Sequence, residues 1–138
     1  MTVDLQSGDR WQVIDELVDS LIGGERLSAA DRGPIIAAVK RRESAMSTGI
    51  GFGMALPHAS TELVSEVVYA VGRSKGGINF DSADAKPVHR VLLFLVPAGQ
   101  FQKHVHVLAD MARLAHAMEL KKIRFLCLHS RLNIAETL

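Results

Sequence analysis

The longest apolar run of the chain is Val91-Leu92-Leu93-Phe94-Leu95-Val96, and it ends at Pro97. A short run that is apolar at every position is typical of a strand covered on both faces of a sheet. As a helix it is much too short to cross a bilayer, which takes about 20 residues. We therefore expect this run to be the central strand of a sheet, in a protein that does not insert into a membrane.

Two amphipathic helices are predicted ahead of this strand, because apolar side chains recur there at spacings of three and four. The first spans residues 9–22 and ends at Gly23 and Gly24, since glycine readily takes the left-handed conformation after a helix. The second begins near Ser28, which with Asp31 resembles a capping box, and runs through Glu43. The apolar positions of the two helices are Trp11, Ile14, Leu17, Val18, Leu21, Ile22, Ile35, Ile36 and Val39.

The remaining segments alternate between strands and turns. Three glycines in residues 47–53 predict a loop, after which residues 54–56 form a strand that reaches Pro57 and His58. We expect a second strand at residues 67–71, a turn at Gly76-Gly77 and a third helix over about residues 102–118. Helices interleaved with buried strands predict an α/β fold. The tail beyond Glu119 fits either a strand or a helix.

Composition narrows the class of protein further. A length of 138 residues predicts a single domain over residues 1–138, because one core commonly serves about 100 to 200 residues. Sixteen Lys and Arg against fifteen Asp and Glu leave a formal charge of +1, which does not favour nucleic-acid binding. The single Cys127 cannot form an internal disulfide, and the N-terminus has no signal-peptide pattern. We expect a soluble, cytoplasmic protein.

Among the six histidines, His58 is the strongest candidate for chemistry. It follows Pro57 at the predicted end of a strand, beside the glycine-rich loop, and ligands bind at strand ends in α/β proteins. A neutral imidazole can attack a phosphoryl or acyl group through one nitrogen while the other is held by a hydrogen bond. The alternative is that His58, like most lone histidines, is a packed or surface residue.

His104 and His106 would face the same way on a strand and could then bind a metal. On the helix expected here their side chains diverge by about 200°, so we do not expect a metal site. His104 falls in the first helical turn, where free N–H groups favour an anion. Arg42 is near enough in sequence to the glycine-rich loop to reach an anion too, or is a solvated helix end. Gly51-x-Gly53 has neither dinucleotide nor P-loop spacing, so no nucleotide cofactor is expected.

Together these residues resemble the enzyme IIA domains of the bacterial phosphoenolpyruvate-dependent sugar phosphotransferase system (PTS), in the fructose/mannitol and nitrogen-related class (EIIA type 2). Arg42-Glu43, followed by Ser47-Thr48-Gly49-Ile50-Gly51-Phe52-Gly53-Met54-Ala55-Leu56-Pro57-His58-Ala59, matches the family's active-site signature along its whole length. The resemblance is clearest over residues 9–118 and fades after Glu119. It implies a mixed β-sheet flanked by helices on both sides.

The resemblance also implies a phosphocarrier that needs no metal or cofactor. His58 would accept a phosphoryl group from the phosphohistidine of the carrier protein HPr and pass it to an enzyme IIB domain. His104 would donate a hydrogen bond to that group, Arg42 would offset its charge, and Thr48 would help to hold its oxygens.

Three roles remain open for such a protein. It is a regulatory module of the nitrogen-related type, a IIA component serving a sugar permease, or a binding module that transfers nothing. A chain without attached IIB, IIC or HPr-like domains favours regulation. Because HPr and a IIB domain must both reach His58, Phe52 and Phe101 are candidate docking residues, with core packing as the alternative for each.

Overall fold

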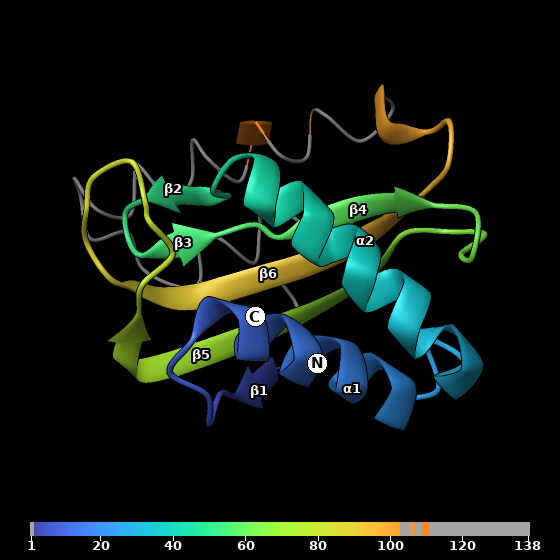
Figure 1. The fold of residues 1–138 in the computed structure, drawn as a ribbon, viewed down its shortest axis with the longest axis horizontal. Helices are drawn as coiled ribbons and strands as arrows, with labels where there is room; N and C mark the ends of the chain where they lie inside the picture. Colours follow the sequence, from blue (N-terminus) through green and yellow to red (C-terminus); the bar gives the residue numbers. More distant parts are fainter. Residues whose placement is uncertain (1, 103–105, 107–108, 111–138) are drawn as a thin grey trace.

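The computed structural model describes residues 2–102, 106, 109 and 110. Two long helices lie against one face of a six-stranded sheet (Figure 1). In chain order the elements are β1 (Thr2–Asp4), α1 (Arg10–Gly23), the 3-10 helix η1 (Ala29–Asp31), α2 (Arg32–Ala45), β2 (Gly49–Gly51), β3 (Met54–Ala55), β4 (His58–Thr61), β5 (Val68–Ile78) and β6 (Val88–Pro97).

Strand β6 is the middle of the sheet, as expected of the apolar run that it contains. It pairs antiparallel with β5 along one edge and parallel with β3 and β4 along the other. β1 adds parallel to β5, and β2 adds antiparallel to β3. The strand order is β1-β5-β6-β3-β2, with β4 on β6 as well. This mixed sheet confirms the predicted fold class.

The run in β6 is apolar throughout because both faces of the strand are buried. Successive side chains of a strand point to opposite faces. Val91, Leu93 and Leu95 join the large core that includes α1 and α2, whereas Leu92, Phe94 and Val96 join a second buried cluster. A polar residue at any of these positions would lose its hydration without gaining a partner.

Helix α1 begins where the sequence predicts, but it ends differently. Asp9 caps the helix, since its carboxylate accepts from the backbone N–H groups of Trp11 and Gln12. The expectation that glycine supplies the left-handed residue is wrong: Gly24 has a φ of −86°, and Glu25 has +61°. The N–H of Glu25 donates to Ile22 and that of Arg26 to Leu21. This Schellman pattern places the left-handed position one residue beyond the glycines.

Strand boundaries account for most of the other differences from the prediction. Residues 49–51 of the expected loop form β2, and β5 runs through the expected turn at Gly76-Gly77 to Ile78. The pairing of β5 with β6 shifts register between Arg73 and Ile78. Gly77 has a φ of +87°, and a Cβ there would lie 2.8 Å from Pro87. The glycine therefore serves an irregular strand instead of a turn.

His58 is the first residue of β4, not the residue at which a strand ends, so that part of the prediction is wrong. The register shows why: Met54 lies opposite Arg90, and His58 lies opposite Phe94, the same offset along β6. β3 and β4 thus follow one line, interrupted only at Leu56 and Pro57. Proline has no N–H to donate to a ladder, which is a sufficient reason for the interruption.

The third helix is described only in part. Phe101, Gln102, His106, Ala109 and Asp110 are helical, and the rest of residues 102–118 lies outside the described residues, as does the tail after Glu119. A helix on the second face of the sheet and a single domain over residues 1–138 stay predictions. In the part of the chain that the structure describes, no helix is long and apolar enough to cross a membrane.

The central position of β6 makes its side chains the most costly to truncate. Leu93 is fully buried, so Leu93→Ala should lower the free energy of unfolding by about 2 to 5 kcal/mol. Leu63 is 43% exposed, and Leu63→Ala should change it by no more than about 0.5 kcal/mol. Urea unfolding of the two variants measures both values. Equal losses would contradict the central placement of β6.

Candidate active site

The imidazole of His58 is held by a backbone carbonyl two residues earlier. Its Nδ1 lies 2.8 Å from the Leu56 carbonyl oxygen, and the side chain is buried, at 8% exposure. A carbonyl oxygen only accepts, so Nδ1 carries the proton. In the neutral ring, the lone pair is therefore on Nε2. This fixes which nitrogen of His58 is able to act as a nucleophile.

Two phenylalanine rings stack on the same imidazole. The Phe94 centroid lies 5.3 Å from that of His58, with 14° between the planes, and the Phe101 centroid lies 5.6 Å away, with 21°. Phe94 projects from β6 directly opposite His58 in the register, whereas Phe101 follows the end of β6. Near-parallel rings at these distances are offset-stacked, so they contact the faces of the imidazole.

Burial lowers the pKa of His58 below its ordinary value of 6.5. The charge of Arg42 acts in the same direction, whereas the bond to Leu56 and the charge of Glu43 raise the pKa without reversing the shift. Burial has this effect because it disfavours the charged imidazolium. His58 is thus neutral at neutral pH, the form that a nucleophile needs.

The loop ahead of His58 is fixed by Glu43, which is only 1% exposed at the end of α2. Its carboxylate accepts from the Thr48 backbone N–H at 2.9 Å and from the Thr48 hydroxyl. The Leu56 N–H in turn donates to the Thr48 carbonyl at 3.0 Å. An unbroken series of hydrogen bonds therefore leads from Glu43 through Thr48 and Leu56 to His58.

No role was predicted for Glu43 from the sequence, although a signal was present. Ile36, Val39 and Glu43 are spaced by three and four, so the carboxylate lies on the apolar face of α2. A charged residue at a core position is rarely buried without a partner. Here Arg10 provides one, with Nη1 3.6 Å from Glu43 Oε2.

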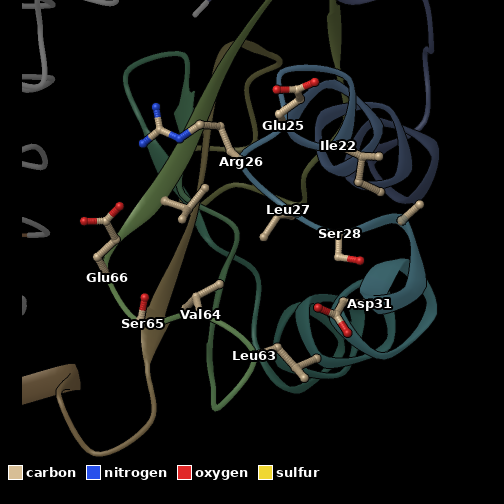
Figure 2. Close-up of a pocket in the computed structure, with 12 residues that line it drawn as sticks. Ile22, Glu25, Arg26, Leu27, Ser28, Asp31, Leu63, Val64, Ser65 and Glu66 are labelled. Carbon is tan, nitrogen blue, oxygen red and sulfur yellow. The ribbon is translucent and has the colours of Figure 1, made fainter.

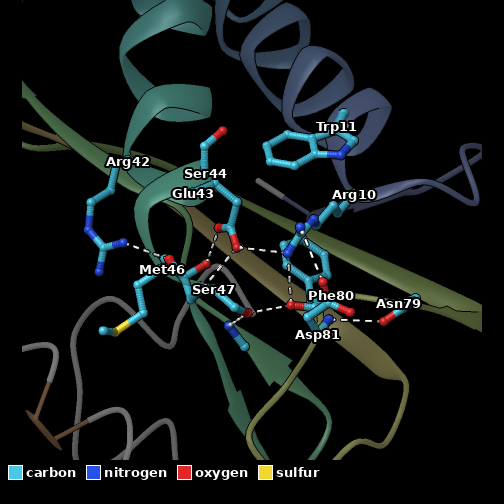
Figure 3. A network of polar contacts seen from close by, with 12 residues as sticks. Arg10, Trp11, Arg42, Glu43, Ser44, Met46, Ser47, Asn79, Phe80 and Asp81 are labelled. Atoms are coloured by element: carbon cyan, nitrogen blue, oxygen red, sulfur yellow. Dashed lines mark hydrogen bonds and ion pairs between the residues drawn. The ribbon is translucent and has the colours of Figure 1, made fainter.

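Arg10 also ties the start of α1 to the loop before β6. Nη1 donates to the Phe80 carbonyl at 3.1 Å, Nη2 lies 3.3 Å from Asp81 Oδ2, and the guanidinium sits 4.5 Å from the Trp11 ring centroid. The Ser47 hydroxyl donates to the same Phe80 carbonyl. Figure 3 shows these groups meeting around Glu43 and Arg10. Three separate segments of the chain are thereby held at one point.

The other predicted site residues have different surroundings. Arg42 is half-buried, donates from Nη1 to the Met46 carbonyl at 2.8 Å, and is close enough for its charge to act on His58. The hydroxyl and N–H of Thr48 are both engaged by Glu43. His104 lies outside the described residues, so its placement beside His58 stays a prediction. His106 is exposed and helical.

Phe52 lies at the tip of the β2–β3 connection, between Gly51 and Gly53. All three residues have positive φ, and Phe52 is the one with a side chain, at +58°. Its N–H donates to Asp84 Oδ2 at 3.1 Å, and its half-buried ring packs against the second apolar cluster. A positive φ is costly for a bulky residue and is retained where the surroundings impose it.

A separate pocket of about 670 Å³ lies between the α1–η1 connection and the β4–β5 connection (Figure 2). Leu27 and Val64 are part of its apolar lining, and Glu25, Asp31 and Glu66 are among its charged residues. His58 does not line it. The pocket and the histidine are therefore two separate features of the described structure.

The chain matches one family over most of its length. Residues 1–124 match the model of the phosphoenolpyruvate-dependent sugar phosphotransferase system, EIIA 2. The fructose-specific EIIABC component of Bacillus subtilis is 36% identical over 120 residues, 87% of this chain and 19% of that protein. The fructose-specific EIIA component of Haloferax volcanii is 37% identical over 100 residues, 72% of this chain and 64% of that protein. The chain thus spans less than two thirds of either relative.

A solved structure supports the same grouping. The crystal structure of nitrogen regulatory protein IIA-Ntr from Neisseria meningitidis superposes with a TM-score of 0.70 and 31% identity, over 80% of this chain and 74% of that one. The resemblance expected from residues 42–59 is confirmed by these matches.

Loss of the Glu43 charge should weaken the hydrogen-bond series that leads to His58. Glu43→Gln should lower the free energy of unfolding by about 1 to 3 kcal/mol, because the amide donates where the carboxylate accepted. The pKa of His58 should fall further, since Glu43 raises it. Urea unfolding and NMR titration measure these effects. Glu62→Gln removes an exposed carboxylate as the control. An unchanged stability in Glu43→Gln would show that the carboxylate does not hold the loop.

The lowered pKa of His58 makes stability depend on pH in a defined direction. Because the unfolded chain binds the proton more readily, the folded state should lose stability as pH falls from 6.5 through the lower folded pKa. Above pH 6.5 His58 is neutral in both the folded and the unfolded state, so this loss of stability is absent there. His58→Gln should lack this component, so the stability difference between the wild type and the variant isolates it. A His58 titration midpoint at or above 6.5 by NMR would contradict the assigned environment.

Proposed function

Because the chain belongs to the EIIA 2 family of the phosphoenolpyruvate-dependent sugar phosphotransferase system, we propose that it is a phosphocarrier that takes up a phosphoryl group on Nε2 of His58. The observation that carries this proposal is the Leu56 carbonyl, 2.8 Å from Nδ1, which leaves the lone pair of a neutral, buried imidazole on Nε2. The donor that we propose is the phosphohistidine of an HPr-like protein.

The transfer requires an in-line displacement at phosphorus. The Nε2 lone pair forms the new N–P bond while the N–P bond of the donor histidine breaks, and the donor ring takes back the electron pair. The His58 ring gains positive charge as the bond forms. The Leu56 carbonyl then accepts a charge-assisted hydrogen bond from Nδ1, which is stronger than the bond to the neutral ring. No metal or cofactor enters this scheme.

Charge on the phosphoryl oxygens needs cationic and hydrogen-bonding groups. We assign Arg42 to offset that charge, which is supported by its electrostatic effect on His58. His104 is proposed to donate a hydrogen bond to an oxygen, as the family resemblance implies. Since the Thr48 donors are engaged by Glu43, its proposed contribution is to fix the loop, and direct contact with phosphate would require it to exchange that bond.

Two acceptors of the phosphoryl group are supported by different relatives. Both fructose-specific proteins favour delivery to a IIB domain, in sugar transport. The nitrogen regulatory structure favours a role in which the phosphorylated and free forms bind different protein targets. In either role Phe52, half-exposed at a loop tip, and Phe101, beside His58, are proposed docking residues. We propose the cytoplasm as the compartment, consistent with a single cysteine.

Incubation with phosphoenolpyruvate, enzyme I and HPr should label His58 with an acid-labile, base-stable phosphate on Nε2. His58→Ala should remove the label. Arg42→Gln and His104→Ala should each slow labelling by about 10-fold to 150-fold, the equivalent of one charge-assisted hydrogen bond of about 1.5 to 3 kcal/mol. Labelling is followed by mass spectrometry, and the modified nitrogen is identified by NMR.

Arg41→Gln is the matched control, because it removes the same charge from an exposed neighbour on α2. Full labelling of His58→Ala would refute the acceptor assignment, and a stable phosphate on His104 would reverse the two roles. Addition of a fructose-type IIB domain separates the two functions: rapid loss of the label indicates transport, and a retained label favours regulation.

A further inference from the structure

We propose that Phe94 and Phe101 are positioning residues that hold the His58 imidazole in one rotamer, with Nε2 at the open edge of the ring. This rests on the proposed function, because it concerns the same nucleophile. The two aromatic rings approach His58 from separate segments, one in the middle of β6 and one beyond its end.

The geometry of the stacks explains why they leave the nucleophile usable. The lone pair of Nε2 lies in the plane of the imidazole and points outward from the ring edge. Phe94 and Phe101 lie within 14° and 21° of that plane's orientation, at centroid distances of 5.3 and 5.6 Å, so they contact the ring faces. They therefore restrict rotation about χ2 without blocking the direction in which phosphorus must approach.

A single hydrogen bond does not achieve this alone. The hydrogen bond to the Leu56 carbonyl fixes the position of Nδ1, but the imidazole ring is still able to tilt about that contact. Stacked rings resist the tilt, because a turn out of plane separates the faces and loses contact area. Carbonyl and phenyl groups together define both the position of Nδ1 and the plane of the ring.

The two phenylalanines differ in how they are themselves held. Phe94 is 4% exposed and belongs to the second apolar cluster, so its ring is fixed by the sheet. Phe101 is half-exposed at the start of a helical segment. Truncation of Phe101 leaves the core intact. A variant at this position therefore changes the orientation of the His58 ring without a large change in the free energy of unfolding.

Among the described residues, the two charged groups that act on His58 both come from α2. Arg42 lowers its pKa and Glu43 raises it, and burial is the largest influence. Phe101→Ala leaves both charges in place and admits water to the ring. The variant should therefore raise the pKa of His58 toward 6.5 and convert a single Nδ1–H tautomer into a mixture of the two neutral forms.

The experiment compares wild type, Phe101→Ala, Phe101→Leu and Phe94→Leu by ¹⁵N NMR of the histidine rings and by labelling from phospho-HPr. We expect labelling of Phe101→Ala to slow by about 10-fold or more, since misplacement by about 1 Å can cost 100-fold. Phe101→Leu keeps an apolar side chain over the imidazole but has no aromatic ring to stack on it. In this variant the pKa of His58 should stay close to its wild-type value, whereas the labelling rate should fall. Phe94→Leu should behave in the same way.

His89 provides an internal reference in the same spectra. Its Nδ1 also lies near a carbonyl oxygen, that of Ser74, at 2.9 Å. His89 is exposed, however, and lies at the start of β6. Its signals should be the same in all variants, and a thermal melt of each variant checks the fold.

Unchanged His58 titration and tautomer in Phe101→Ala would overturn the positioning role. Slower labelling with an unchanged titration would leave Phe101 with only the docking role proposed above, which also overturns the positioning role. If wild type accepts no phosphoryl group, the proposed function fails, and the titration still decides whether Phe101 orients the ring.

Discussion

The buried carboxylate of Glu43 is the constraint on which the rest of the site depends. Placing a charge in a core is unfavourable unless it is paired and hydrogen-bonded. Glu43 meets that requirement with Arg10 on one side and both donors of Thr48 on the other. The end of α2, the start of α1 and the segment that leads into β2 are therefore held together. Loss of any one partner would leave another buried group unsatisfied.

This arrangement separates two demands that conflict in a nucleophilic histidine. The ring must be desolvated enough to stay neutral, and its reacting nitrogen must remain open to a partner protein. Aromatic contacts and burial supply the first, while the backbone carbonyl of Leu56 assigns the proton to Nδ1. Arg42 adds positive charge nearby, which favours the neutral ring and also an incoming anion.

Much of the fold could be predicted from local patterns. The apolar run of β6 requires burial on both faces, and the spacing of Ile14, Leu17 and Leu21 requires one buried helical face, so both were identifiable without a structure. Glycine positions were predicted less well. Gly24 was expected to end α1 and Gly77 to turn the chain. The end of α1 is instead set by the N–H groups of Glu25 and Arg26, which donate to carbonyls of the last helical turn, and Gly77 lies within β5.

The candidate site was only partly predictable, for a related reason. His58 was identified from its sequence neighbours, and a motif is local. The contacts that define its chemistry are not: Phe94 meets it through strand pairing, and Arg10 reaches Glu43 from a separate helix. Such contacts depend on register and packing, which the spacing of residues in one segment does not specify. The spacing of apolar residues on α2 indicated that Glu43 is buried, but no local pattern indicated that Arg10 is its partner.

The interruption between β3 and β4 also determines which strand pairing must break before the site can unfold locally. Phe94 donates its N–H to the Pro57 carbonyl, and the residues that follow His58 pair with β6 as far as Pro97. His58 is thus anchored beside the most buried strand of the described sheet, in contrast to a residue in a mobile loop. Opening it would require β4 to detach from β6, which is a sub-global unfolding event with a high free-energy cost. The Phe94 N–H that donates to Pro57 should therefore exchange slowly, and the backbone that carries His58 stays in place for as long as β4 remains paired with β6.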